Sequence, residues 1–328
     1  VAPKMIRAVK ATLHDTRAVL HVEGEQRQVD VAEGTGQGTT LGPVLCNFFF
    51  LPLLLQWERA WAARATQLHH TDSDKGEGRT SNSLLHSFAD DVAVILDNRR
   101  EAEQTAADLY SYLQDFLVDM HVATAGTDTS KSVVLFIPAT ADQQEETGEA
   151  PLQVGSTGQQ WINFVKQAKY LGQTITTDLS DDKHIKTRMS KASQVFGALR
   201  RQMLGRKDVW NCVKARVMVT MVIPTMLDGL ECCVVTAAMM RAMESQYLRQ
   251  VRSCLRVTPY TQRKHKLTSM QLLTRLGVFP LHHYLDLKVL AYAGHVNRMP
   301  LERLPRVTRN CKMTGPRHIG RPAKSHMH

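Results

Sequence analysis

The sequence has few cysteines, and none of them forms a CxxC pair. Six Cys are scattered through 328 residues. A disulfide framework or a cysteine-based zinc site would need closely spaced pairs. The fourteen histidines include no HExxH spacing, which argues against a zinc hydrolase. We therefore expect an intracellular protein, nuclear or cytoplasmic and not secreted, without structural zinc.

No apolar run is long enough to span a membrane. The closest, residues 44–57, contains Asn47, Pro52 and Gln56, whereas a spanning helix needs about 20 mostly apolar residues. The chain begins with Val1 and shows no signal peptide, so we expect it to be a piece of a longer protein. Membrane contact is not expected.

Acidic residues are scarce in the second half of the chain. Residues 1–150 carry 12 Lys and Arg against 22 Asp and Glu, whereas residues 151–328 carry 29 against 9. A formal net charge of +10 thus hides a strongly basic half. Such a half is typical of proteins that contact a polyanion, although a basic face can also simply be solvated. We expect nucleic acid as the partner.

Two adjacent carboxylates are the most informative feature that is present. Asp90 and Asp91 lie between two apolar runs, residues 84–89 and 92–96. Runs of this length predict buried strands, and their close spacing predicts a β-hairpin with both carboxylates at its tip. Two neighbouring negative charges favour a divalent cation, and Mg²⁺ prefers carboxylate oxygens. The alternative is an ordinary Asp-containing turn.

Hydrophobic periodicity predicts a mixed α/β first part and a helical second part that begins near residue 178. One helical stripe of apolar residues begins after Asp181. Its members are Ile185, Met189, Ala192, Phe196 and Leu199. The other expected helices cover residues 3–14, 43–65 with a kink at Pro52, 100–118, 208–222, 236–256, 268–276 and 281–298. The expected strands are a hairpin within 18–31, a buried strand at 133–137 and a pair within 161–176. Residues 69–83 and 138–160 are expected to be loops, and the tail from residue 300 to be extended.

Four short segments occur in an order and spacing that resemble a known family. They are a glycine- and glutamine-containing loop, the Phe-Ala-Asp-Asp stretch, a Thr-Ser-Lys stretch and a Lys-Tyr-Leu-Gly stretch. Together they resemble the reverse transcriptase of non-LTR (LINE-type) retrotransposons, of the endonuclease–reverse transcriptase class. The resemblance implies these roles: nucleotide and template binding for Gly36, Gln37 and Gly38; catalysis and metal binding for Asp90 and Asp91; catalysis for Lys131; and a primer grip for Tyr170, Leu171 and Gly172.

Each segment also has a plainer interpretation. Gly36 and Gly38 would let a backbone approach a base pair closely, but they also suit a turn before a helix. Lys131 could neutralise departing pyrophosphate, or it could be a solvated lysine at a strand edge. Tyr170 and Leu171 could pack against a primer, or they could belong to an apolar strand core.

The resemblance implies an α+β fold, namely a partial polymerase palm, an antiparallel sheet with helices, followed by an all-helical basic thumb-like domain. The partial palm would span residues 1–178, the thumb-like domain 179–299 and a basic extended tail 300–328. The implied activity is transfer of a deoxynucleotide to the 3′-hydroxyl of a DNA primer on an RNA template, with Mg²⁺ as cofactor. The residues expected to contact the nucleic-acid backbone are Lys183, Lys186, Arg188, Lys191, Arg200 and Arg201.

The chain departs from the family pattern at its beginning. The fingers and an upstream strand that carries a further metal-binding aspartate are expected in a missing upstream region, which could also include an endonuclease domain. Gly42 stands where the family has serine, and Cys46 where it has phenylalanine. We therefore expect the isolated chain to be inactive. The alternatives are a non-catalytic nucleic-acid-binding protein derived from a retroelement, and an RNA-dependent polymerase or maturase of another lineage.

Overall fold

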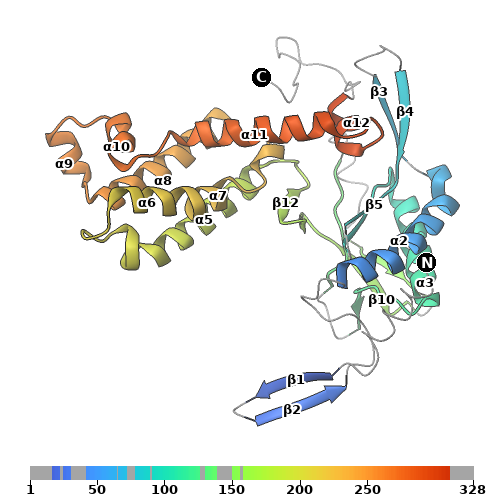
Figure 1. Cartoon of the computed structure of the whole chain (residues 1–328). Coiled ribbons are helices and arrows are strands. Elements are labelled where there is room, and N and C mark those ends of the chain that lie inside the picture. The colour runs from blue at the N-terminus through green and yellow to red at the C-terminus, as the bar shows by residue number, and fades with distance from the viewer. Residues whose placement is uncertain are drawn as a thin grey trace. The chain divides into compact units, whose positions relative to one another are not determined.

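The computed structural model describes most of the chain. It covers residues 17–22, 25–30, 42–64, 66–71, 78–88, 91–125, 130–138, 150–155 and 158–310. The helices and strands are drawn in Figure 1. The chain divides into two compact units, residues 1–66 with 82–97, and residues 67–81 with 98–328. The class is α+β with small sheets, mostly antiparallel, as the sequence predicts.

The described residues of the first unit form two β-hairpins and one long helix. β1 (Arg17–Val22) and β2 (Glu25–Asp30) pair antiparallel, which confirms the predicted hairpin. α2 (Gly42–Trp61) contains Pro52, which removes one helical hydrogen bond, and continues into the 3₁₀ turn η1 (Ala62–Arg64). The second hairpin is β5 (Leu85–Phe88) with β6 (Asp91–Val94), and Asp91 is the first residue of β6.

A small mixed sheet in the second unit is built from β7 (Ala123–Thr124), β8 (Val133–Val134), β9 (Leu152–Val154) and β10 (Gln160–Phe164). The central strand β10 pairs antiparallel with β7 and β9 and parallel with β8. α3 (Arg99–Asp115) begins at Asn98, whose side-chain oxygen accepts the Glu101 N–H at 2.9 Å. Tyr110 of α3 packs with the buried side chains of β9 and β10.

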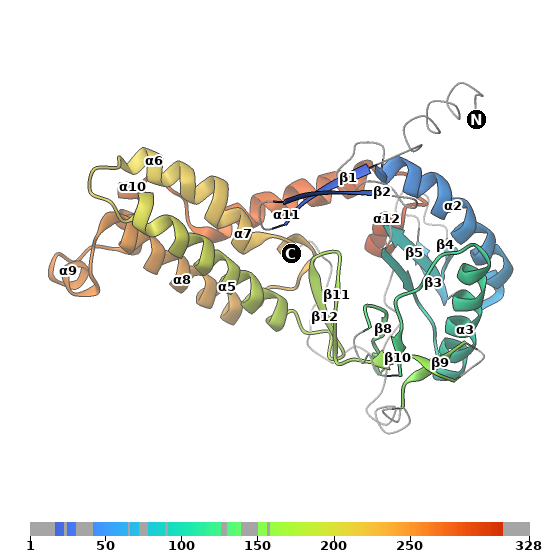
Figure 2. The same ribbon diagram turned by 90° about the horizontal axis from the view of Figure 1, so that it is seen from below.

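An elongated bundle of helices follows the hairpin of β11 (Gln167–Tyr170) and β12 (Gln173–Thr176) (Figure 2). In order, its elements are α5 (Asp182–Leu199), η2 (Arg200–Leu204), α6 (Asn211–Val217), η3 (Met218–Val222), α7 (Ile223–Leu227), η4 (Leu230–Cys232), α8 (Ala237–Leu255), α9 (Pro259–Lys264), α10 (Ser269–Leu276), α11 (Leu281–Arg298) and α12 (Leu304–Asn310). Figures 1 and 2 place the β11–β12 hairpin at one end and α9 with α10 at the other.

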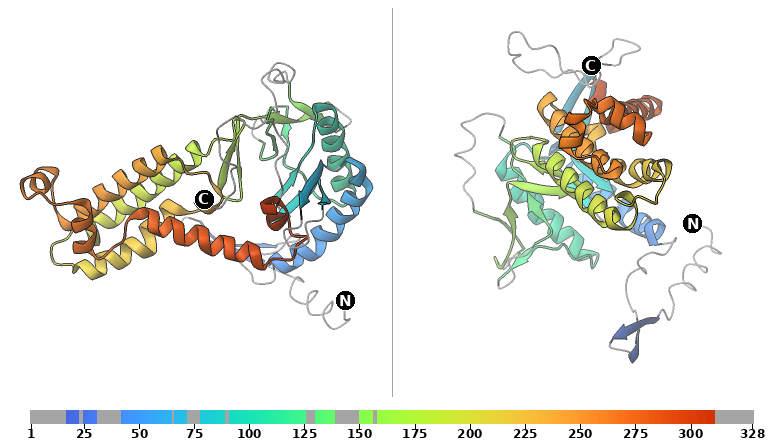
Figure 3. Two further views of the ribbon diagram at one scale, coloured as in Figure 1. Left: turned by 90° about the horizontal axis from the view of Figure 1, so that it is seen from above. Right: turned by 90° about the vertical axis from the view of Figure 1, so that its left-hand side faces the viewer.

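The bundle buries one large apolar core. The predicted stripe on α5 is confirmed, since Ile185, Ala192 and Phe196 are buried and Met189 packs beside them. They meet core residues of the later helices, among them Met218, Met226, Met243, Tyr247, Leu272, Leu276 and Leu285. The right panel of Figure 3 looks down the bundle from its α9 end and shows its helices grouped together. Burial of this apolar surface is the main stabilising term of the bundle.

Local sequence signals set where several of these helices begin and end. α10 starts with a reciprocal capping box, in which the Thr268 hydroxyl accepts the Gln271 N–H and the Gln271 amide oxygen accepts the Thr268 N–H. It ends at Gly277, whose φ of +84° lets its N–H and that of Val278 reach the Leu273 carbonyl. η2 and η3 are π-helical turns, which are uncommon and occur often at functional sites.

Several sequence-based expectations are wrong. Part of the expected loop at 69–83 forms two paired strands, β3 (Thr66–Thr71) and β4 (Gly78–Ser83). The expected buried strand at 133–137 shrinks to β8, and Val133 and Ile137 are exposed. Strand β9 lies inside the expected loop at 138–160, because Leu152 and Val154 pack under α3. α12 occupies part of the tail expected to be extended.

Other expectations are untested or lie elsewhere. The predicted helix at 3–14 falls outside the described residues. The domain boundaries at 178 and 299 stay predictions. Within the part of the chain that the structure describes, no helix combines the length and apolar character needed to cross a lipid bilayer.

Candidate functional site

The β5–β6 hairpin presents Asp91 to solvent. Phe88 and Asp91 are the last paired residues before the connection, and the pairing continues at the base through the Ile95 N–H and the Leu84 carbonyl at 2.8 Å. The predicted hairpin is therefore confirmed. The prediction that its strands are buried is wrong for the tip, because Phe88 is 66% exposed and Asp91 is also exposed, whereas Leu84 at the base is buried.

Part of the predicted catalytic set lies outside the described residues. These are Asp90 and the loop residues Gly36, Gln37 and Gly38. Among the described residues, no three His, Cys, Asp or Glu side chains gather closely enough to hold a metal ion. Asp91 is thus the predicted metal ligand whose position is known, and its exposed carboxylate supplies the oxygen donors that suit Mg²⁺.

Lys131 stands in a turn of the second unit. The Ser130 hydroxyl lies 2.8 Å from the His121 carbonyl, and the Lys131 backbone N–H donates to His121 Nδ1 at 3.2 Å. These bonds hold the backbone of the turn, while the Lys131 side chain is exposed. The Lys131 ammonium group is therefore accessible to an anion in solution, such as a phosphate.

The Tyr170-Leu171-Gly172 segment forms a tight turn between β11 and β12. Tyr170 pairs with Gln173 across the hairpin. Leu171 and Gly172 both have positive φ, +46° and +80°, the arrangement of a two-residue hairpin turn that follows the twist of its strands. Leu171 is 50% exposed at the tip although a leucine seldom adopts this conformation. The turn therefore holds an apolar side chain out toward solvent.

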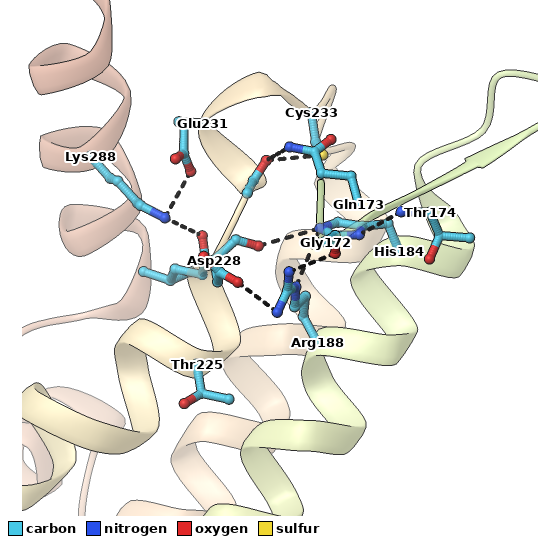
Figure 4. A network of polar contacts seen from close by, with 12 residues as sticks. Gly172, Gln173, Thr174, His184, Arg188, Thr225, Asp228, Glu231, Cys233 and Lys288 are labelled. Carbon is cyan, nitrogen blue, oxygen red and sulfur yellow. Dashed lines mark hydrogen bonds and ion pairs between the residues drawn. The ribbon is translucent and has the colours of Figure 1, made fainter. Parts of the chain in front are cut away.

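Arg188 of α5 ties this turn to the loop after α7 (Figure 4). Its Nη2 donates to the Gly172 carbonyl at 2.9 Å, and its Nη1 lies 2.6 Å from Asp228 Oδ2. The side chain is only 9% exposed, so the guanidinium is held between the two. The predicted contact of Arg188 with a nucleic-acid backbone stays a prediction, and in the structure its Nη1 and Nη2 face acceptors of the protein.

His184, one turn earlier on α5, completes the same network. It is buried, and its Nδ1 accepts the Thr174 N–H at 3.3 Å. Nδ1 is then unprotonated, so Nε2 carries the hydrogen and donates to the Asp228 carbonyl at 3.3 Å. The 3.5 Å separation between Arg188 Nε and His184 Nε2 is on this tautomer a packing contact.

Gly229 lets the loop approach the hairpin closely. Its φ is +78°, and a Cβ there would lie 3.0 Å from Gln173 Nε2 and 3.1 Å from His184 Nε2. The Gln173 amide donates to the Gly229 carbonyl at 3.2 Å. A side chain at position 229 would force these groups apart. We call this region the hairpin end of the bundle. It comprises the β11–β12 hairpin, the start of α5 and residues 228–234.

The other predicted backbone-contacting residues are exposed, as phosphate contacts require. They lie on α5 and η2: Lys183, Lys186, Lys191, Arg200 and Arg201. Arg200 and Arg201 belong to the opposite end of the bundle, where η2, residues 205–210, the last turns of α8 and α9 come together. We call this the arginine end.

Two adjoining clefts open at the arginine end. One, of about 530 Å³, is lined by Arg200, Gly205, Arg249, Arg252, Ser253, Arg256, Val257, Thr258 and Pro259. The other, of about 480 Å³, is lined by Gly197, Arg200, Arg201, Gly205 and Arg206. Arg200 and Gly205 line both clefts, which are therefore neighbours. No lysine or acidic residue lines either of them.

Sequence reasoning missed part of both ends. Arg249, Arg252 and Arg256 recur at helical spacing within the predicted helix 236–256, and that basic periodicity could have found them. Asp228 and Gly229 form a dipeptide typical of a turn, but nothing in the sequence connects them to Arg188, 40 residues earlier.

No family model, no curated protein and no solved structure matches the chain.

Proposed function

We propose that this chain is part of a reverse transcriptase of the non-LTR retrotransposon type, comprising part of the palm and a thumb. It would bind an RNA template and a DNA primer and add deoxynucleotides to the primer. The observation that carries the proposal is the β5–β6 hairpin, which presents Asp91 in solvent directly after a two-residue connection. The order of the four motifs along the chain supports it.

The residues of the hairpin suit a magnesium-dependent transfer. Asp90 and Asp91 would hold Mg²⁺, which when bound stabilises the attacking and leaving oxygens of the phosphoryl transfer. Lys131, exposed on its held turn, would neutralise charge on the departing pyrophosphate. Every one of these side chains acts by position and charge, because phosphoryl transfer depends on orientation and electrostatics more than on covalent chemistry.

The turn at Leu171 and Gly172 would contact the primer. Arg188 positions this turn from behind through the Gly172 carbonyl, and Asp228 orients Arg188. The exposed Leu171 side chain would pack against the sugar of the terminal nucleotide. Lys183, Lys186 and Lys191 are exposed on the same helix and would contact backbone phosphates.

The proposal is tested by where a primer terminus binds. A DNA primer with a photoreactive 3′-terminal nucleotide is annealed to an RNA template, cross-linked to the full chain in Mg²⁺, and the adducts are mapped by mass spectrometry. We expect adducts within residues 85–94 and 167–176. Asp91→Asn should reduce the first set, because a magnesium ligand is lost. Adducts that avoid both segments would refute the proposal.

Formation of the cross-link does not require catalytic turnover. Turnover itself, as the resemblance implies, would need an upstream aspartate. Extension of the primer by the isolated chain, lost in Asp91→Asn, would support the function and overturn the expectation of inactivity.

A second candidate function is nucleic-acid binding without catalysis. The arginine end favours it, because that end offers charge and clefts without any acidic lining. Binding that weakens with salt, does not depend on Mg²⁺ and leaves residues 85–94 unlabelled would select this candidate.

A further inference from the structure

The arginine end concentrates positive charge to an extent that neither the hairpin chemistry nor the primer grip uses. Residues 196–210 and 249–266 together carry ten Lys and Arg and a single acidic residue, Asp208. Asp208 is already engaged, since both of its oxygens accept from Arg206. The remaining charge has no counterpart in these segments, and an ordered anion would offset the repulsion.

Three cleft arginines have unoccupied guanidinium groups. Arg252 donates to Gln262 at 3.2 Å. In contrast, Arg200, Arg249 and Arg256 are exposed, and their side chains make no hydrogen bond or ion pair within the described parts of the chain. A guanidinium presents a planar fork of donors that matches phosphate oxygens in pairs. Three such forks around one cleft form a site for more than one phosphate.

The backbone of the clefts is specialised. The Gly205 N–H donates to the Arg200 carbonyl five residues earlier, at 2.8 Å, which widens the helix into the π-helical turn η2. A Cβ on residue 205 would lie 2.9 Å from that carbonyl, so the turn needs glycine. Arg256 ends α8 with a φ of +58°, where glycine is usual. An arginine occupies this position although the conformation disfavours a residue with a Cβ.

Two exposed aromatic side chains follow the cleft-lining segments along the chain. Trp210 is 77% exposed and follows the loop that contributes Arg206. Tyr260 is 68% exposed and follows Pro259, a lining residue of the larger cleft. Exposed aromatics next to arginines are the arrangement by which proteins stack unpaired bases while holding their phosphates. In a duplex the bases are already stacked and cannot use these rings.

We propose that the arginine end is a binding site for single-stranded nucleic acid. The phosphates would follow Arg200, Arg249 and Arg256 through the two clefts, and exposed bases would stack on Trp210 and Tyr260. The proposal rests on the second candidate function and deepens it, because it names the form of nucleic acid bound at the arginine end and the residues that would bind it. It needs neither metal nor catalysis.

The first test compares ligands on the full chain without metal. The probes are an unstructured 15-nucleotide pyrimidine RNA, its DNA equivalent, a duplex of the same length and vesicles containing phosphatidylserine. We expect the single strands to bind at least about fivefold more tightly than the duplex, because stacking is added to phosphate contact. Equal or tighter binding of the duplex or of the vesicles would overturn the proposal.

The second test separates the clefts from general charge. Arg249→Gln should weaken single-strand binding about five- to tenfold and lower the slope of log affinity against log salt by about 0.7, the value for one phosphate contact on a single strand. Arg241→Gln is the matched control, since Arg241 is an exposed arginine of the same helix that lines neither cleft. Equal effects of the two substitutions would contradict the site.

A third variant separates binding from folding. Arg256→Gly removes a cleft arginine while giving the end of α8 the residue that its φ favours. We expect the variant to be at least as stable as the parent to heat, with single-strand affinity reduced about fivefold. A stable variant that binds normally would remove Arg256 from the site.

The stacking contact has its own readout. Single-stranded RNA should quench the fluorescence of Trp210, and this part of the quenching should disappear in Trp210→Phe while phosphate-driven binding largely persists. Quenching that is identical in the parent and in Trp210→Phe would rule out the base contact. Because these tests use binding at the arginine end alone, their outcome is independent of the primer cross-link to residues 85–94.

Discussion

Arg188 and Arg200 belong to one continuous run of helix, yet they lie in opposite environments at the two ends of the bundle. At the hairpin end, the Arg188 guanidinium is buried between Asp228 and the Gly172 carbonyl. At the arginine end, Arg200 lines two clefts with further arginines and no acidic residue. The same side chain thus fixes a turn at one end and is available for an anion at the other.

The contrast shows that a basic helix is not one uniform surface. Burial and a carboxylate make Arg188 part of the internal structure, whereas exposure without a partner leaves Arg200 open to a ligand. The environment, and not the residue type, separates stabilisation from binding. The comparison can be tested by making the same kind of change, or the same chemical modification, at one position of each end and measuring the two effects.

Replacement of the two arginines should give the largest difference. Arg188→Met keeps much of the aliphatic volume but removes the contacts with Asp228 and Gly172, so we expect a loss of about 2–3 kcal/mol in the free energy of unfolding. Arg200→Met removes an exposed, unpaired group and should change it by no more than about 0.5 kcal/mol. Urea unfolding followed by circular dichroism at 222 nm measures both. Similar losses would show that the ends do not differ in this way.

The reactivity of two thiols, one at each end of the bundle, should also differ. Burial, with the Asp181 carboxylate close by, raises the pKa of the Cys233 thiol at the hairpin end to about 12. Thiolate is the reactive form, so at pH 8 we expect Cys233 to react with iodoacetamide about 30- to 100-fold more slowly than the exposed Cys212, which lies toward the arginine end. The Cys233 rate should still rise with pH above 9. Peptide fragmentation after timed alkylation resolves Cys233 from Cys232, and equal rates for Cys212 and Cys233 would contradict the assignment.

Replacement of two glycines should give the smallest individual changes in stability, with opposite signs. Gly229→Ala at the hairpin end combines a positive φ with contacts of 3.0 and 3.1 Å, so we expect a loss of about 1–2 kcal/mol. Gly197→Ala, within α5 and with no atom within 4 Å of the new Cβ, should gain about 0.5–1 kcal/mol. Thermal unfolding of the two variants beside the parent measures both signs. A gain for Gly229→Ala would mean that the close approach of this loop to β12 is not required.

Several elements could be predicted from sequence with little error. The helix expected at 281–298 is α11, Leu281–Arg298. The helix expected at 236–256 is one residue longer than α8 at each end, and the one expected at 268–276 starts one residue before α10. These helices carry strong local signals, such as the Thr268 cap and Gly277, which act within a few residues of the chain. The hairpin around Asp91 was predictable for the same reason.

Elements that depend on distant partners were not predictable. β9 was expected to be loop because its neighbours are polar, but packing with Tyr110 of α3 and with Ile162 of β10 makes Leu152 and Val154 core residues. Strands β3 and β4 contain few apolar residues, so their pairing leaves little hydrophobic pattern to recognise.

The sequence by itself determined which chemical groups and local elements are present, namely adjacent carboxylates in a predicted hairpin, a basic second half and helices with clear ends. Those properties follow from residue type and short-range periodicity, which act along the chain. Only the tertiary structure decided which arginines are internal and which line a cleft. The reason is physical, because burial and pairing depend on residues such as Asp228 and Arg249, which are brought near Arg188 and Arg200 by folding and not by position in the sequence.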